Sequence, residues 1–181
     1  MTLQGEHGLR FDLSIDGYQF PEILYGDDAN WLMVRGEVRH PHGDWTFRDP
    51  CLETSDLERL ADWFDGIATG RSEAEEDFLE PNLSFEYDSS PATISVTFSH
   101  ESVPAWSGDD GRFEGVKVIF PLALNDPLEA ARNLRDWLAR FPRLSRIFAK
   151  PSRNIWLSWM ISRPEYAAPI FYCLRPLTTD H

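Results

Sequence analysis

The chain contains little cysteine and no long hydrophobic run. Its two cysteines, Cys51 and Cys173, each lie in an apolar stretch, which is typical of buried reduced thiols rather than of a disulfide or a nucleophile. No run approaches the roughly 18 apolar residues that a membrane span requires. Residues 1–11 lack the basic start and the apolar core of a signal peptide. We therefore expect a cytoplasmic protein without a membrane partner.

Basic residues are scarce in the first 126 positions. That part carries 8 Lys and Arg against 26 Asp and Glu, a net charge of −18, whereas residues 127–181 carry 9 against 4, and the whole chain has a net charge of −13. Phosphate groups need clustered Lys and Arg to replace their counterions, so this charge argues against nucleic acid as the direct ligand. A basic partner is the natural complement of this acidic protein, although acidic surfaces also serve solubility alone.

Catalytic motifs are absent as well. The sequence has no GxSxG, GxxxxGK[ST], GxGxxG or HExxH, and we expect no enzymatic activity. The alternative is an enzyme that uses the loop from His100 to Gly111, since loops often carry catalytic groups. Ser99 and Ser102 stand too close to His100 in sequence for it to be assumed as their base.

The histidines of the segment HPHGD raise the question of a metal site. His40, His42 and Asp44 could present three ligands, but Pro41 separates the histidines and no remote Cys/His pair completes a coordination set. We predict a solvated hairpin tip, no metal and no cofactor.

The remaining composition is that of a folded protein. Hydrophobic residues make up 42% and aromatic residues 13% of 181 positions, which suits a single domain over residues 1–181. Alternating or β-branched runs predict strands. They lie at 9–15, 31–38, 44–47, 83–87, 92–99 and 112–122, with two further candidates in the tail, 154–161 and 169–174.

Two segments have helical spacing. In the first, Ser55 and Glu58 form a predicted capping box and Gly70 a stop. The second begins with Asp126 as N-cap, Pro127 and Glu129, and Pro142 lies beyond its end. The predicted buried faces are Leu57, Leu60, Ala61, Phe64, Ile67 and Ala68 in the first helix, and Leu128, Ala131, Leu134, Leu138 and Phe141, with Trp137 alongside, in the second.

The order of these elements predicts an α+β fold, a mostly antiparallel β-sheet with two amphipathic helices packed on it. Residues 9–70 and 82–141 each read as three strands and a helix, which suggests a pseudo-repeat. Residues 71–77 are expected to form a charged connection. The strand-rich tail 143–181 would close the sheet or cover one of its edges.

The stretch GDDAN at residues 26–30 permits two interpretations. Adjacent carboxylates beside an amide can bind a cation, but Asx residues ahead of a strand also accept bonds from nearby backbone amides. We favour the turn, with Asp28 as an acceptor within it.

Five short segments together resemble the WapI family of bacterial immunity proteins. They are DDANWL (27–32), RDPCLET (48–54), LADWF (60–64), EPNLSFEY (80–87) and FPLALNDPL (120–128). The resemblance implies a protein of bacterial competition that binds the C-terminal domain of a polymorphic toxin and blocks it in the producing cell. Several such toxins degrade RNA, and the family supplies no active-site residues.

Candidate partner-binding residues follow from charge and exposure. Trp106 is a large rigid anchor of the kind enriched in interfaces, and Asp109, Asp110 and Glu101 surround it with negative charge. Asp27 and Asp28 form a second acidic pair. Two alternatives stay open: Trp106 folds back over a sheet edge, or the aromatic residues line a concave pocket for a small ligand. The oligomeric state is not predicted.

Overall fold

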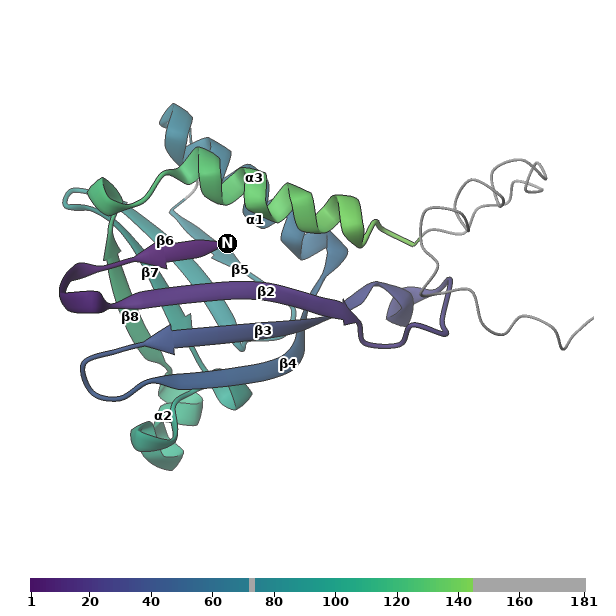
Figure 1. Ribbon diagram of the computed structural model, residues 1–181, viewed down its shortest axis with the longest axis horizontal. Coiled ribbons are helices and arrows are strands. Elements are labelled where there is room, and N and C mark those ends of the chain that lie inside the picture. The colour runs from purple at the N-terminus through teal and green to yellow at the C-terminus, as the bar shows by residue number, and fades with distance from the viewer. Residues whose placement is uncertain (72–73, 145–181) are drawn as a thin grey trace, which may run out of the picture. The chain divides into compact units, whose positions relative to one another are not determined.

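The described part of the chain is built from two antiparallel sheets and three α-helices. The computed structural model describes residues 1–71 and 74–144, which belong to one compact unit. Each sheet has four strands in chain order, joined as a meander (Figure 1). The strands are β1 (Thr2–Gln4), β2 (Arg10–Tyr18), β3 (Trp31–Arg39) and β4 (Trp45–Glu53) in sheet A, and β5 (Glu75–Asp77), β6 (Leu83–Ser89), β7 (Ala92–Phe98) and β8 (Val116–Pro121) in sheet B.

One long helix follows each meander, and a short helix lies between β7 and β8. They are α1 (Thr54–Thr69), α2 (Gly108–Glu114) and α3 (Pro127–Arg140), and short 3-10 turns include η2 (Asp27–Asn30), η3 (His100–Ser102), η4 (Ala105–Ser107) and η5 (Leu122–Leu124). The predicted α+β class and antiparallel pairing are confirmed. The single predicted sheet is wrong, because the strands divide into two sheets. Each sheet holds four strands rather than the predicted three, and the pseudo-repeat stays a prediction.

Aromatic side chains from both sheets meet in the core. The Phe98 ring on β7 contacts Phe11 on β2 at 5.0 Å, Trp45 on β4 at 5.3 Å and Phe47 on β4 at 6.0 Å between ring centroids. Gly36 on β3 makes room for this packing, since a Cβ there would lie 2.0 Å from the Phe47 ring. Burial of these rings holds the two sheets face to face.

The two long helices pack on each other and close one side of the sheets (Figure 1). The predicted apolar face of α1 is buried except for Ala68, and Phe64 reaches Phe85 of sheet B at 6.3 Å. In α3, Ala130, Ala131 and Leu134 are buried. Leu128, predicted to be buried, is exposed because it lies in the first turn, at the end of the helix.

Helix boundaries follow the expected signals with one shift. Gly70 ends α1 in the left-handed conformation, with φ of 66°. Asp126 caps α3 by accepting the Leu128 N–H at 2.9 Å. The predicted capping box of Ser55 and Glu58 is wrong. Instead the Glu53 N–H donates to Asp56 at 2.8 Å, so α1 begins at Thr54.

Three short segments differ from the sequence-based expectation. Residues 112–114 belong to α2 rather than to a strand, and β8 begins only at Val116. The connection 71–77 contributes β5, and β1 was not predicted at all. Both are three-residue strands, too short to show a period. The predicted tail strands and Cys173 lie outside the described residues, and the single-domain assignment stays a prediction.

Candidate functional site

The tip of the β3–β4 hairpin and the segment 100–114 together form the candidate site. Trp106 on η4 lies over the hairpin, where its indole Nε1 donates to the Gly43 carbonyl at 3.2 Å. Its ring stacks on His40, with centroids 5.6 Å apart and planes 24° from parallel, and meets Trp45 edge-on at 5.9 Å. The side chain is still 43% exposed. Trp106 therefore covers the hairpin tip with one side and leaves the other exposed to solvent.

Asp109 and Asp110 begin the short helix α2 rather than forming a loop turn. Both are exposed, and neither makes an ion pair with another described residue. Acidic residues in a first helical turn are stabilised by the helix dipole, which explains their helical placement. Among the described residues, no cation compensates their charge.

Glu101 on η3 is the one predicted acid of this group that is already paired. Its carboxylate accepts a hydrogen bond from Arg112 of α2 at 2.6 Å. The pair ties η3 to α2 and neutralises Arg112, the cation nearest to Asp109 and Asp110 in sequence. Glu101 therefore adds no unpaired negative charge to this surface. It instead compensates the positive charge of Arg112, which would repel a basic protein.

The other predicted acids lie elsewhere. Asp27 and Asp28 belong to η2, directly before β3, whereas the hairpin tip follows β3. A strand of nine residues spans about 30 Å, so the two acidic pairs cannot belong to one small site. Asp28 makes no side-chain hydrogen bond with the described residues, and its predicted role as turn acceptor is wrong. The neighbouring Asn30 takes the structural role.

Most Lys and Arg side chains of residues 1–126 already form ion pairs with Asp or Glu. On the outer face of sheet A, Arg35 and Arg48 both bind Asp16, at 3.0 and 2.6 Å, and Arg10 binds Asp12 at 2.5 Å. The first two bonds hold the pKa of Asp16 below its ordinary value. That face is nearly balanced in charge, so the acidic excess lies on other surfaces, α2 among them.

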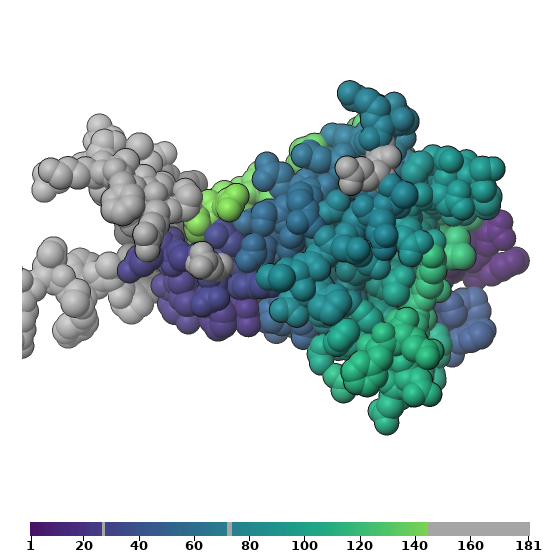
Figure 2. All heavy atoms as spheres, turned by 180° about the vertical axis from the view of Figure 1, so that it is seen from behind, coloured from purple at the N-terminus to yellow at the C-terminus, as the bar shows by residue number. Residues whose placement is uncertain are grey.

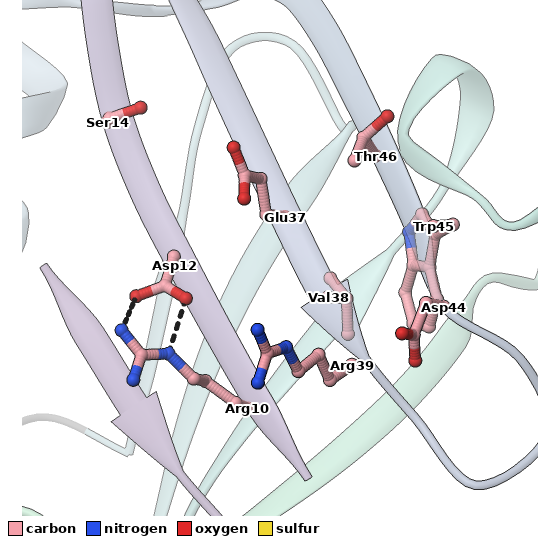
Figure 3. A pocket seen from close by; sticks show the side chains of 9 residues that line it. All are labelled: Arg10, Asp12, Ser14, Glu37, Val38, Arg39, Asp44, Trp45 and Thr46. Carbon is pink, nitrogen blue, oxygen red and sulfur yellow. Dashed lines mark hydrogen bonds and ion pairs between the residues drawn. The ribbon is translucent and has the colours of Figure 1, made fainter.

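The same face of sheet A carries a basin of about 660 Å³, shown in Figure 3. Glu37 and Arg39 lie side by side along β3 within it, near the Arg10–Asp12 pair. The lining is charged rather than apolar, unlike most small-ligand pockets. Trp45 is the one aromatic residue in this lining, whereas Phe11, Phe47 and Phe98 pack between the sheets.

The histidines of the hairpin do not assemble a metal site. The His42 N–H donates to Nδ1 of His40 at 3.2 Å, and the His40 N–H donates to Asp44 at 3.0 Å. These bonds use a potential ligand atom of His40 and one of Asp44. Burial, and then the charge of His42, lower the pKa of His40. Within residues 1–71 and 74–144, no three His, Cys, Asp or Glu side chains are grouped to hold a metal ion.

The serine hydroxyls next to His100 in sequence bond to backbone carbonyls rather than to its imidazole. The Ser99 hydroxyl donates to the Pro81 carbonyl, and the Ser102 hydroxyl donates to Asn82 and Ser99 carbonyls at 2.5 and 2.8 Å. The buried Nδ1 atom of His100 has no hydrogen-bond partner among the described residues. Burial raises the pKa of the Cys51 thiol, so this thiol stays protonated.

Phe113 is a feature of this surface that the sequence did not reveal. It was assigned to a strand, but it lies in α2 and is 80% exposed. The signals that could have shown the helix are the glycines at both ends of GDDGRFEG and the two acids in the first turn.

Comparison with known proteins assigns the chain to a family. The model of the "Immunity protein WapI-like family" matches residues 2–142. No curated protein and no solved structure matches the chain significantly. No described helix has the length and apolar character needed to cross a bilayer. The family match covers both sheets and all three described helices, and the chain therefore belongs to the WapI-like immunity proteins.

Proposed function

We propose that this immunity protein neutralises a basic toxin domain by binding it with the surface of η4 and α2. Family membership implies a cognate toxin protein as the partner. The observation that carries the choice of surface is the uncompensated pair Asp109 and Asp110, beside the half-exposed Trp106. In protein interfaces, a few aromatic residues often supply most of the binding energy, and polar residues surround them.

The negative charge of the protein supports the proposal that its toxin acts on a polyanion such as a nucleic acid. A nuclease domain must itself be basic to hold its phosphates, and an acidic inhibitor complements such a domain electrostatically. The proposed partner is the C-terminal domain of the toxin, blocked by a stoichiometric complex. No enzymatic step and no cofactor enter the proposal.

The test measures binding to the immobilised C-terminal domain of the toxin encoded beside this gene, at low and moderate salt. The Asp109→Asn and Asp110→Asn double variant keeps the side-chain size and removes two negative charges. We expect slower association and weaker salt dependence than for wild type, with unchanged folding, because surface charges steer encounter. The matched control is Glu58→Gln with Glu75→Gln, which removes two charges from exposed positions on α1 and β5.

The two double variants separate a local interface from the effect of net charge. If both slow association equally, the acidic character of the whole chain steers binding and α2 has no special part. If the α2 variant binds with wild-type kinetics, the interface lies on another surface. Either result would contradict the proposed site, and absence of binding by wild type would contradict the function itself.

A further inference from the structure

Phe113 is the most exposed large apolar side chain in the described part of the chain. It is 80% exposed, against 76% for Leu79 and 43% for Trp106. A single exposed apolar residue is common on protein surfaces. Phe113, however, lies on the same short segment as Trp106, and grouped exposed aromatics mark interaction surfaces.

The backbone under Phe113 is firmly packed. Gly111 of α2 lies against Ser107 so closely that a Cβ would come within 2.3 Å of the Ser107 hydroxyl. That hydroxyl donates to the Pro104 carbonyl at 2.8 Å. On the other side, the Phe113 ring meets the His100 ring edge-on at 6.3 Å. The helix therefore presents Phe113 from a supported position, which lowers the ordering cost on binding.

The segment projects from the body of the protein. Figure 1 shows α2 beyond the ends of the strands, and Figure 2 shows the same segment as a green lobe standing out from the surface. A convex surface fits a recess rather than a flat face. Around Phe113, Asp109, Asp110 and Glu114 are exposed and unpaired with other described residues, whereas Arg112 is neutralised by Glu101.

We propose that Phe113 inserts into an apolar recess of the toxin domain that is rimmed by Lys and Arg side chains. This inference rests on the proposed function and adds the shape and chemistry of the partner surface. Phe113 supplies apolar contact that slows dissociation, while the acids around it meet the basic rim and speed association. The protein thus covers a basic concavity of the toxin with a convex aromatic lobe.

The test compares Phe113→Ala with Leu79→Ala for binding to the same immobilised toxin domain. Both side chains are similarly exposed, so neither change should alter the melting temperature. We expect Phe113→Ala to raise the dissociation rate roughly tenfold or more, the range of a contributing interface residue. Leu79→Ala, beyond β5 in the chain, should leave that rate within about twofold of wild type, as expected outside an interface.

A third variant, Phe113→Glu, separates apolar contact from charge. If a basic rim alone attracted this surface, an added carboxylate would preserve or strengthen binding. Insertion into an apolar recess predicts that Phe113→Glu binds at least as poorly as Phe113→Ala, because a carboxylate would be buried there. Tight binding by Phe113→Glu would overturn the recess.

The outcomes distinguish this inference from the proposed function. If wild type binds and protects against the toxin while Phe113→Ala dissociates at the wild-type rate, the recess is wrong and the function stands. Equal losses in Phe113→Ala and Leu79→Ala would also overturn it. If wild type neither binds nor protects, the proposed function is wrong and this inference falls with it.

Discussion

Asn30 holds the backbone of Leu144 with both polar atoms of its side chain, across 114 positions of sequence. Its Oδ1 accepts the Leu144 N–H at 2.7 Å and its Nδ2 donates to the Leu144 carbonyl at 3.1 Å. The Thr54 hydroxyl also donates to Oδ1, at 3.2 Å. One side chain thus connects the entry to β3, the start of α1 and the chain beyond α3.

Asn125 makes the same kind of contact at the edge between the sheets. It accepts the Gln4 N–H at 2.7 Å and donates to the Gln4 carbonyl at 2.9 Å. Gln4 ends β1 and Asn125 follows η5, close to the end of β8. Each Asn amide thus satisfies one backbone N–H and one backbone carbonyl of a distant segment.

Replacing Asn30 by Ala should destabilise the protein by about 2 kcal/mol, because it leaves partly buried backbone groups without partners. Urea unfolding at neutral pH measures this change. Asp28→Ala is the matched control, since Asp28 makes no side-chain bond with the described residues, and it should change stability by under about 0.5 kcal/mol. Equal effects of the two substitutions would show that the bonds to Leu144 contribute nothing.

Truncating leucines on the buried faces of α1 and α3 should lower stability by amounts that follow their burial. Leu60→Ala and Leu134→Ala should each cost about 2 to 5 kcal/mol, because both side chains are fully buried and leave cavities. Leu138→Ala should cost less, since Leu138 is partly buried at the edge of the core. Chemical denaturation would contradict the helix orientation if Leu138→Ala proved the most damaging of the three.

Replacing Asp49 should increase thermal stability by an amount that depends on pH. Burial, and then the charges of Glu101 and Glu80, raise the pKa of its carboxyl above the ordinary 3.8. The folded state therefore disfavours the ionised carboxylate, which lowers the free energy of unfolding. This loss of stability is complete above the folded-state pKa and disappears as the pH falls toward 3.8. Asp49→Asn should raise the melting temperature at pH 7, and the gain should shrink as the pH is lowered toward 4.

Asp16 provides the control of opposite sign. Hydrogen bonds from Arg35 and Arg48 lower the pKa of its carboxyl. Its ionised form stabilises the folded state above the ordinary pKa, and this contribution is lost only as pH falls below about 4. Asp16→Asn should therefore lower the melting temperature at pH 7. Thermal melts in which both variants shift in the same direction would refute the electrostatic explanation.

Trp106 should affect both stability and binding. Trp106→Ala removes the stack on His40 and the bond to Gly43, which should cost about 1 to 2 kcal/mol of folding stability. It should also weaken toxin binding by about 2 kcal/mol or more, through faster dissociation, if its exposed side is an interface anchor. His40→Ala removes the stack but leaves the indole, so its binding loss should be smaller. Equal binding by the two variants would assign Trp106 to folding alone.

Periodicity and punctuation in the sequence determined the two long helices and the longer strands. Apolar spacing marked the buried face of α1, and Asp126 and Pro127 marked the first turn of α3, because these signals depend on residues within one or two turns of each other. Charge counting likewise required no structure. It argued against nucleic acid as a direct ligand and led to the prediction of a basic protein partner.

The tertiary structure decided which strands share a sheet and which polar residues hold distant segments together. Alternation within a strand shows that one face is buried but not what covers it, so two facing sheets and one covered sheet look alike in sequence. Asn30 stands at the end of the predicted turn, yet its partner Leu144 lies far along the chain. Trp106 and Phe113 also acquired their half-covered and projecting positions only through contacts with the hairpin tip and with His100. Such contacts join residues far apart in sequence, and local patterns carry no record of them.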